Sequence, residues 1–242
     1  MRDTHKRPTR QTEEKLEFIV RNTRLEDSDA VRDVIVLANG GRLDAPWMSA
    51  RSVAEQLRRF PEGQFVAVLK DGDEERVIGA ATTMRTSRSP FETPLRWMEM
   101  IGSYGIANHE AHGQWLYGVE IAVLPEFRRR GVASAMYKVR LALVEKFGLE
   151  GWYAGGMLMG YHRYEDRMTQ AEYYRKVVDG ELNDPTVSMQ MHRGLKASGF
   201  IEDYCEAPQA GNAAVLLVWQ PATRARRDRQ VAVTDLGARA QR

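Results

Sequence analysis

The sequence predicts a mixed α/β fold with one strand–turn–helix unit at its centre. Its 242 residues are enough for one large domain, or for one domain with tails. Its hydrophobic fraction of 43% is sufficient for a packed core. Segments that alternate apolar and polar residues are interspersed along the chain with segments of helical periodicity. Strands and helices mixed in this order are typical of an α/β or α+β domain.

The first part of the chain predicts a strand, two helices and a hairpin. Residues 16–23 alternate apolar and polar side chains, as a half-buried strand does. One helix is expected to end near residues 39–41, and a second one before Pro61. Residues 64–70 and 77–84 predict two strands joined by a turn. The capping residues expected for the two helices are Asp27, Ser28 and Asp29 for the first, and Ser49 or Ser52 for the second.

The most informative stretch lies between residues 115 and 156. Residues 115–123 predict a strand, and residues 126–130 a charged turn. Gly131 is expected to open a helix that reaches residue 147. A short strand at residues 151–154 follows.

The flanking segments carry weaker signals. Residues 86–113 contain several Gly and Pro residues, and predict a long loop with a strand embedded in it. Residues 160–185 read as an insertion with its own helix at about 169–180. A further helix is expected over residues 186–198, closed by Gly199 as its C-terminal cap. Strands at 200–204 and 213–219 would complete the sheet.

The turn before the central helix predicts an anion-binding site. Backbone N–H groups at a helix N-terminus, together with the positive end of the helix dipole, attract phosphate. Gly131 and Ala133 carry little side-chain bulk, so that a diphosphate could approach the backbone closely. Three successive arginines would add charge-assisted contacts. The turn lacks the Gly-Lys-Ser/Thr of a P-loop and the Gly-x-Gly-x-x-Gly of a dinucleotide site. These arginines are Arg128, Arg129 and Arg130.

The segment VEIAVLPEFRRRGVASAMYKVRLALVEKFG resembles the acyl-CoA-binding segment of the GNAT family of N-acetyltransferases. The family signature, Gln/Arg-x-x-Gly-x-Gly/Ala, is matched by Arg128, Gly131 and Ala133. The likeness in element order extends from about residue 16 to about residue 220. It implies a mixed, mostly antiparallel central sheet with helices on both faces and a splayed pair of central strands.

A narrower likeness involves WLYGVEIAV, AGGMLMGYHRY and AEYYRKVVDGELNDPTVSMQ. These segments resemble the acetyltransferase half of bacterial proteins in which this domain precedes a carbon–nitrogen hydrolase. We expect the resemblance to cover the transferase half only.

The resemblance implies a set of contacts to acetyl-CoA, the expected cosubstrate. Backbone groups of the splayed strand would pair with the pantetheine amides, and the turn would hold the diphosphate. Ser188 stands where the family often has an asparagine that contacts the cofactor. The residues implied in cofactor binding are Ile121, Ala122, Val123, Arg128, Arg129, Arg130, Gly131, Val132, Ala133, Ser134 and Ser188.

Glu120 occupies the position at which many family members carry the general base. An amine must lose a proton to attack near neutral pH, and a carboxylate can accept it directly or through a water. In a regular strand the side chain of Glu120 points away from those of Val119 and Ile121, and could therefore face the substrate. The alternative is an ordinary charged residue on the solvent face, or a salt-bridge partner.

The proton donor for the departing thiolate is open. Counting back from Gly199 places Leu195 where the family often has a tyrosine. Tyr161 and His162, in the segment GYHRY, are the catalytic candidates, and for His162 a structural role is favoured over a catalytic one. The thiolate could also leave without a dedicated acid, since its conjugate thiol is not very basic. Other hydroxyl and imidazole groups that could serve are Tyr164, Tyr173, Tyr174 and His192.

Composition sets the remaining expectations. We expect a tail at residues 1–14, a GNAT domain at 15–220 and a basic tail at 221–242, which holds six arginines against two aspartates. A single cysteine and the lack of a long apolar run or secretory signal favour a cytoplasmic protein without a membrane partner. His109 and His112, with Glu110 between them, form a His-x-x-His spacing that lacks a third convincing ligand, so no metal is expected.

The leading hypothesis is an acetyl-CoA-dependent N-acetyltransferase that acylates a small-molecule amine or an amine-bearing acceptor. One alternative is a non-catalytic acyl-CoA-binding or sensing module. Another is an interaction domain whose basic tails bind nucleic acid, although the body shows no basic face with interleaved aromatic residues. A homodimer is left open.

Overall fold

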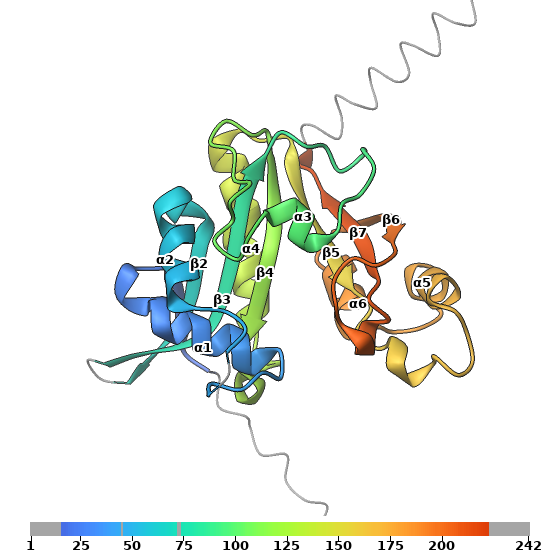
Figure 1. Cartoon of the computed structure of the whole chain (residues 1–242), viewed down its shortest axis with the longest axis horizontal. Coiled ribbons are helices and arrows are strands. Elements are labelled where there is room, and N and C mark those ends of the chain that lie inside the picture. The colour runs from blue at the N-terminus through green and yellow to red at the C-terminus, as the bar shows by residue number, and fades with distance from the viewer. Residues whose placement is uncertain (1–15, 45, 72–73, 223–242) are drawn as a thin grey trace, which may run out of the picture.

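The computed structural model describes residues 16–44, 46–71 and 74–222. The expected N-terminal tail lies outside these residues, as does the expected C-terminal tail apart from residues 221–222. Seven strands form one sheet in the order β1-β2-β3-β4-β5-β7-β6 (Figure 1). Only β4 and β5 pair in parallel, and the other neighbours are antiparallel. The mixed, mostly antiparallel sheet predicted from the sequence is therefore confirmed.

The first half of the fold follows the predicted order. It consists of β1 (Phe18–Asn22), α1 (Ser28–Ala38), α2 (Ala50–Arg59), β2 (Gln64–Asp71) and β3 (Glu74–Thr86). Ser49 caps α2, because its side chain accepts a hydrogen bond from the N–H of Ser52 at 3.2 Å. Asp27 stands at the N-cap position of α1 without a side-chain cap bond, so periodicity placed these elements together with the cap at Ser49.

The central unit also agrees with the prediction. It consists of β4 (Trp115–Val123), α4 (Val132–Phe147) and β5 (Gly151–Met157). The register between β3 and β4 shifts next to Val119, because Thr82 pairs with Glu120 while Thr83 pairs with Gly118. This bulge inserts Val119 as an extra residue in β4.

The segment before β4 differs from the prediction. Beyond Thr86, where β3 ends, it contains no strand as far as residue 113, so the expected embedded strand is wrong; instead α3 (Trp97–Ile101) forms there. A carboxylate oxygen of Glu99 accepts the N–H of Arg96 at 3.1 Å and caps this short helix. The indole N–H of Trp97 donates to the carbonyl of Val119 at 2.9 Å, and so fastens the helix to the bulge of β4.

The C-terminal segment contains α5 (Gln170–Val178), α6 (Val187–Met191), β6 (Lys196–Ile201) and β7 (Ala214–Trp219). The expected helix over 186–198 is wrong beyond Met191, since β6 begins at Lys196 and pairs with β7. Gly199 is not a cap but lies in β6, where the register with β7 shifts. Gly194, at φ 88°, makes the turn that ends the helical segment. Pairing with β7 overrides the helical periodicity of this stretch.

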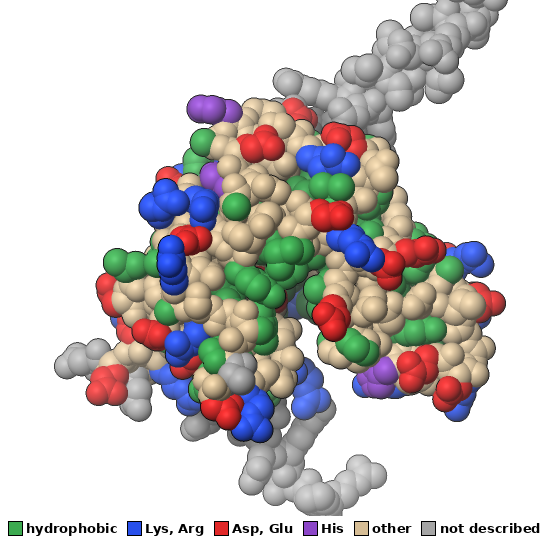
Figure 2. All heavy atoms as spheres, viewed as in Figure 1, with side chains coloured by type: hydrophobic (Ala, Val, Ile, Leu, Met, Phe, Trp, Pro, Cys, Tyr) green, Lys and Arg blue, Asp and Glu red, His purple; other side chains and the backbone are tan. Residues whose placement is uncertain are grey.

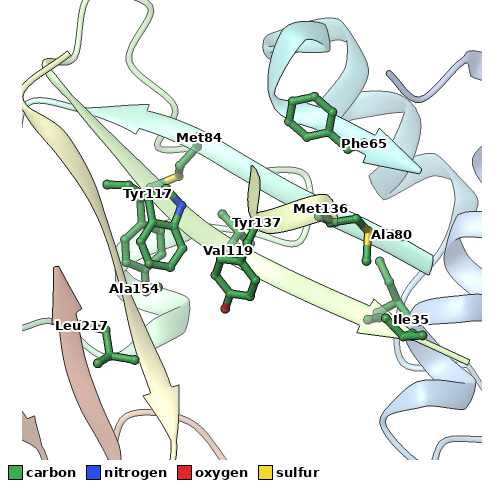
Figure 3. Close-up of a cluster of buried hydrophobic side chains, with 14 of the residues drawn as sticks. Ile35, Phe65, Ala80, Met84, Tyr117, Val119, Met136, Tyr137, Ala154 and Leu217 are labelled. Carbon is green, nitrogen blue, oxygen red and sulfur yellow. The ribbon is translucent and has the colours of Figure 1, made fainter. Parts of the chain in front are cut away.

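Helices cover both faces of the sheet. In Figure 1, α1, α2 and α3 lie in front of the sheet, and α4 and α6 lie behind it. The core fills the space between these layers, with Ile35 of α1, Ala80 of β3 and Met136 of α4 among its buried side chains (Figure 3). No helix in the described part of the chain has the length and apolar character needed to cross a lipid bilayer.

Candidate active site

The site is built where β4 and β5 diverge. The two strands pair only from Trp115↔Gly151 to Tyr117↔Tyr153, after which β5 continues with β7 alone. The two halves of the sheet therefore open into a V, which is visible between β4 and β5 in Figure 1. From Gly118 onward, β4 has no strand partner on this side. This is the splayed pair expected from the resemblance.

Side chains occupy some of the backbone groups that the splay exposes. Besides the bond from Trp97 to Val119, the N–H of Ile121 donates to Oε1 of Glu120 at 3.0 Å. The carbonyl of Val123 accepts Nε of Arg128 at 3.2 Å. Ala122 is buried between these positions. The predicted pantetheine contacts of this strand would thus compete with bonds that the protein makes to itself.

The side chain of Arg128 is hydrogen-bonded within the protein, and its expected phosphate contact stays a prediction. Its Nη2 donates to the carbonyl of Ala38 at 2.6 Å, at the C-terminal end of α1. Together with the bond to Val123, this braces the end of β4 against α1. The side chain of this signature arginine therefore holds the loop against α1 and the end of β4.

The backbone of the loop has the form that an anion site requires. Arg129 and Gly131 both have left-handed conformations, with φ of 60° and 88°. Successive turns of this kind aim N–H groups toward one concave point. The first bond of α4 runs from the N–H of Ala135 to the carbonyl of Gly131, so the N–H groups of Val132, Ala133 and Ser134 have no carbonyl partner within the helix.

Space around this loop is open. A Cβ added at Gly131 would meet no atom within 4 Å. Arg129 and Arg130 are exposed beside it, and Val132 points inward as a buried anchor of the helix. The predicted turn residues therefore lie together, with the dipole of a 16-residue helix behind them.

Arg193 is a cation that the sequence analysis did not anticipate here. From the turn after α6, its Nη2 donates to Oγ of Ser134 and its Nη1 to the carbonyl of Met189 at 2.7 Å. Fifty-nine residues separate Arg193 from Ser134, and no local pattern in the sequence links them. Besides the arginines of the turn, the N-terminus of α4 is thus flanked by the guanidinium of Arg193.

A row of buried polar atoms without hydrogen-bond partners leads inward from Ser134. All of them belong to residues around the ring of Tyr137, whose hydroxyl accepts Nε2 of Gln190 at 2.7 Å. A Cβ at Gly156 of β5 would lie 2.4 Å from Oε1 of Gln190, and one at Gly118 of β4 would lie 2.6 Å from Nη2 of Arg140. The row therefore reaches both strands of the splay. Among the described residues its unpartnered atoms are Arg193 Nε, Gln190 Oε1, Trp152 Nε1, Arg140 Nε and Arg140 Nη1.

Ser188 is engaged within its own segment. Its Oγ accepts the N–H of Asp184 at 2.9 Å, and its carbonyl accepts the N–H of His192. Asp184 in turn accepts the N–H of Gly160 at 2.8 Å. The serine therefore helps to hold the turn into α6, and its predicted cofactor contact stays a prediction.

Glu120 lines a pocket on the opposite face of the sheet, beneath α1, α2 and α3. Because of the bulge, Val119 and Glu120 line the same pocket, so the expectation that they point to opposite faces is wrong. Figure 2 shows hydrophobic side chains gathered at the centre of this face, beside the hollow between the two halves. The lining residues are Ile35, Trp47, Met48, Gln56, Thr82, Trp97, Ile101, Tyr104, Val119 and Glu120.

The environment of Glu120 changes its acidity. Burial raises the pKa of its carboxyl from 4.5 to about 7, and the N–H of Ile121 and the charge of Arg140 oppose that rise. Arg140 approaches from α4 on the other face, where burial lowers the pKa of its guanidinium. A carboxyl with a pKa near 7 can exchange protons close to neutral pH, which a general base needs.

Tyr161 and His162 do not lie with Glu120. They belong to the 3-10 turn Tyr161–Arg163, and neither lines the pocket. The hydroxyl of Tyr161 donates to the carbonyl of Met168 at 3.1 Å, and His162 is exposed. Leu195 is buried between α6 and β6, so that the helix assumed in counting back from Gly199 does not exist there.

A buried tyrosine pair beside the splay was not anticipated. The hydroxyls of Tyr117 and Tyr204 lie 2.6 Å apart. The ring of Tyr204 lies directly against β5, because a Cβ at Gly155 would come within 2.3 Å of it. Burial raises the pKa of Tyr204, and Glu120 is close enough to add to that rise. The YCEAP segment carries no motif that would have marked this tyrosine.

The loop at residues 109–112 is tied to the protein by its histidine. Nδ1 of His109 accepts the N–H of Arg85 at 3.0 Å, and its ring stacks on Phe60. In the part of the chain that the structure describes, no group of three His, Cys, Asp or Glu side chains is placed to hold a metal ion.

A splayed sheet beside a helix N-terminus with this loop defines the class of GNAT-fold proteins. The profile described as the acetyltransferase (GNAT) family matches residues 32–157, just over half of the chain. The chain therefore belongs to this family.

Two curated relatives come from Bacillus subtilis (strain 168). The chain is 28% identical over 172 residues to the uncharacterized N-acetyltransferase YkwB, covering 71% of this chain and 74% of that protein. It is 27% identical over 203 residues to the probable hydrolase YhcX, covering 84% of this chain but only 38% of that protein. A match confined to part of a probable hydrolase agrees with the narrower resemblance noted from the sequence.

Solved structures share the fold. The loading GNATL domain of CurA from Lyngbya majuscula superimposes with a TM-score of 0.69 at 18% identity. The GNAT-like decarboxylase GphF, solved in complex with isobutyryl-CoA, superimposes with a TM-score of 0.67 at 20% identity. Each match covers 84% of this chain and 98% of the other chain.

Proposed function

We propose that the protein is an acetyl-CoA-dependent N-acetyltransferase. It transfers an acetyl or similarly small acyl group to a primary amine by direct attack in a ternary complex. The observation that carries this proposal is the pairing of two sites across one splay. A loop whose backbone form suits an anion lies on one face with a row of unpartnered polar atoms, and a carboxyl with a pKa near 7 lies on the other face.

The cofactor face fits an acyl-CoA. The N–H groups at the start of α4, with Arg193 beside them, suit a diphosphate. The amides of a pantetheine arm offer both donors and acceptors, which match the unpartnered atoms of Gln190 and Arg140. Buried polar atoms rarely stay unpaired in a native structure, so a ligand with complementary groups would relieve their cost. Membership of the family and the isobutyryl-CoA bound to GphF support the same cosubstrate.

Glu120 is the proposed base or water-positioning residue. As the amine nitrogen bonds to the acyl carbon, the carboxylate takes the proton that the nitrogen loses. Breakage of the carbon–sulfur bond leaves a thiolate, for which the hydroxyl of Tyr204, at the splay, is the proposed proton donor. This replaces the role that the sequence analysis sought in Tyr161 or His162.

Two glycines of α4 allow a matched test of the cofactor site. Gly131 and Gly148 stand at opposite ends of the helix, both with positive φ and both with open space around a Cβ. Gly131→Val should abolish acetyl-CoA binding measured by calorimetry, whereas Gly148→Val carries similar backbone strain and should still bind. Equal binding by both variants, or no binding by the unmodified chain, would refute the proposal.

Catalysis is tested separately by CoA release in the presence of amines. Turnover that requires an amine supports the enzyme, and its loss in Glu120→Gln supports the base. Acetyl-CoA binding without turnover of any amine would instead favour a non-catalytic acyl-CoA module. A single cysteine in 242 residues suits a reducing cytoplasm as the setting of this activity.

A further inference from the structure

The residues that line the pocket around Glu120 limit which amines could bind there as acceptors. Seven of its ten lining residues are hydrophobic, and Glu120 is the only ionisable carboxylate or base among them. The space between these side chains is narrow, so the occupant is small.

Three aromatic rings form one wall of this pocket. The centroid of Tyr104 lies 5.4 Å from that of Trp47 and 5.8 Å from that of Trp97. Trp47 stands at the mouth, 39% exposed. Aromatic faces attract ammonium groups and also cover apolar carbon.

The polar lining atoms are largely used within the protein. Nε2 of Gln56 donates to the carbonyl of Tyr104 at 2.7 Å, and its Oε1 accepts the hydroxyl of Thr82 at 3.2 Å. The indole N–H of Trp97 is held by Val119. What the pocket offers an incoming molecule is therefore one carboxylate and several apolar or aromatic surfaces.

We infer that the acceptor is a small monoamine with an aromatic or branched apolar body. This inference rests on the proposed function and names the substrate class of the same site. The amino group would approach Glu120, and the body would lie against Trp47, Trp97 and Tyr104. A second ammonium group, as in a diamine or polyamine, would have to lose water against apolar side chains without a partner for its charge.

The test compares amines of similar size that differ in charge. With acetyl-CoA, kcat/KM for 2-phenylethylamine and isoamylamine should exceed that for putrescine and spermidine by about tenfold or more. A preference for putrescine or spermidine would overturn the inference. So would failure of all four amines in a protein that binds acetyl-CoA. Absence of acetyl-CoA binding would overturn the proposed function itself, which separates the two failures.

Trp47 allows a second test with a control. Trp47→Ala should raise KM for 2-phenylethylamine about tenfold while leaving the Kd of acetyl-CoA unchanged. Trp47→Glu adds a second carboxylate at the mouth, and should shift the preference toward putrescine. Phe91 is exposed and outside this pocket, so Phe91→Ala should change neither value. Unchanged amine preference in both Trp47 variants would contradict the inference.

Discussion

Glu120 combines three properties that seldom coincide in one side chain. It lies at a bulge, it caps the N–H of the residue that follows it, and burial shifts its titration toward neutral pH. Arg140 reaches the same strand from the other face, and its positive charge stabilises the ionised carboxylate of Glu120. The pKa of Glu120 therefore depends on groups that lie on both faces of the sheet.

The pKa of Glu120 has a consequence for stability. Its folded value, about 7, lies above the ordinary 4.5, so folding favours its neutral form. The contribution of this carboxyl to the free energy of unfolding is fully present below pH 4.5, and it is lost as the pH rises through 7. Glu120→Gln should therefore be more stable than the unmodified protein at pH 8, by at most about 3 kcal/mol, and should lose that advantage at pH 4.

Urea unfolding at the two pH values measures this difference. The same variant should lower kcat/KM by roughly 10²–10⁴-fold if Glu120 is the base. The rise of activity through about pH 7 in the unmodified protein should disappear in the variant. A stability difference that does not change between pH 4 and pH 8 would show that the carboxyl titrates normally.

Tyr204 can be tested against a buried tyrosine elsewhere. Tyr204→Phe removes the hydroxyl beside the splay and should reduce kcat about 10²-fold with little change in KM for acetyl-CoA. Tyr161→Phe removes a hydroxyl that bonds to Met168, away from the pocket, and should leave kcat unchanged. If Tyr161→Phe is the variant that loses activity, the donor belongs to the 161–164 segment instead.

At the scale of elements, α4 contributes to both functions of the site. Its first turn forms the proposed anion site, and further along the helix Tyr137 and Arg140, three residues apart, are buried against the sheet. The guanidinium of Arg140 lies 5.2 Å from the ring of Trp152, with two nitrogens unpartnered. A buried cation of this kind contributes little stability by itself, because the loss of its hydration is expensive.

Arg140→Met should therefore change the acidity of Glu120 more than the stability of the fold. Without the nearby cation the pKa of Glu120 rises, so the pH at which activity appears should move upward. The free energy of unfolding at pH 7 should change by less than about 2 kcal/mol. Lys138→Met, at an exposed position of the same helix, is the control and should leave the pH profile in place. An unshifted profile in Arg140→Met would remove Arg140 from the account of Glu120.

At the scale of the whole molecule, the two halves of the sheet share few strand contacts. Only three residue pairs join β4 to β5, while the hydroxyl pair of Tyr117 and Tyr204 and the bond from the N–H of Trp97 to the carbonyl of Tyr204 add cross-links on one face. On the other face, Arg193 and Gln190 reach across to α4. A ligand held between these halves would bind the folded chain only.

Acetyl-CoA should accordingly stabilise the protein against unfolding. At a concentration of 100 times its Kd, mass action adds about 2.7 kcal/mol to the free energy of unfolding. Chemical unfolding with and without acetyl-CoA measures the gain, and Gly131→Val should show none of it. A gain that persists in Gly131→Val would place the ligand away from the loop.

Local signals in the sequence were enough for the elements on which the fold depends. Ser49 as a cap, the strand at 115–123 and the helix opened by Gly131 each carry a sequence signal that spans only a few residues, so pattern alone located them. The loop residues of the proposed anion site were found for the same reason. Where distant pairing competes with local preference, as at β6 and α3, the pattern was misleading.

The composition of the site, in contrast, depended on packing between segments far apart in the chain. Trp47, the pair Trp97 and Tyr104, and Glu120 come from three segments, and Arg193 meets Ser134 across 59 residues. The bulge at Val119 redirected the side chains of β4, and burial set the pKa of Glu120. Local backbone preferences act over a few residues, whereas side-chain proximity and dielectric environment exist only once the chain has packed.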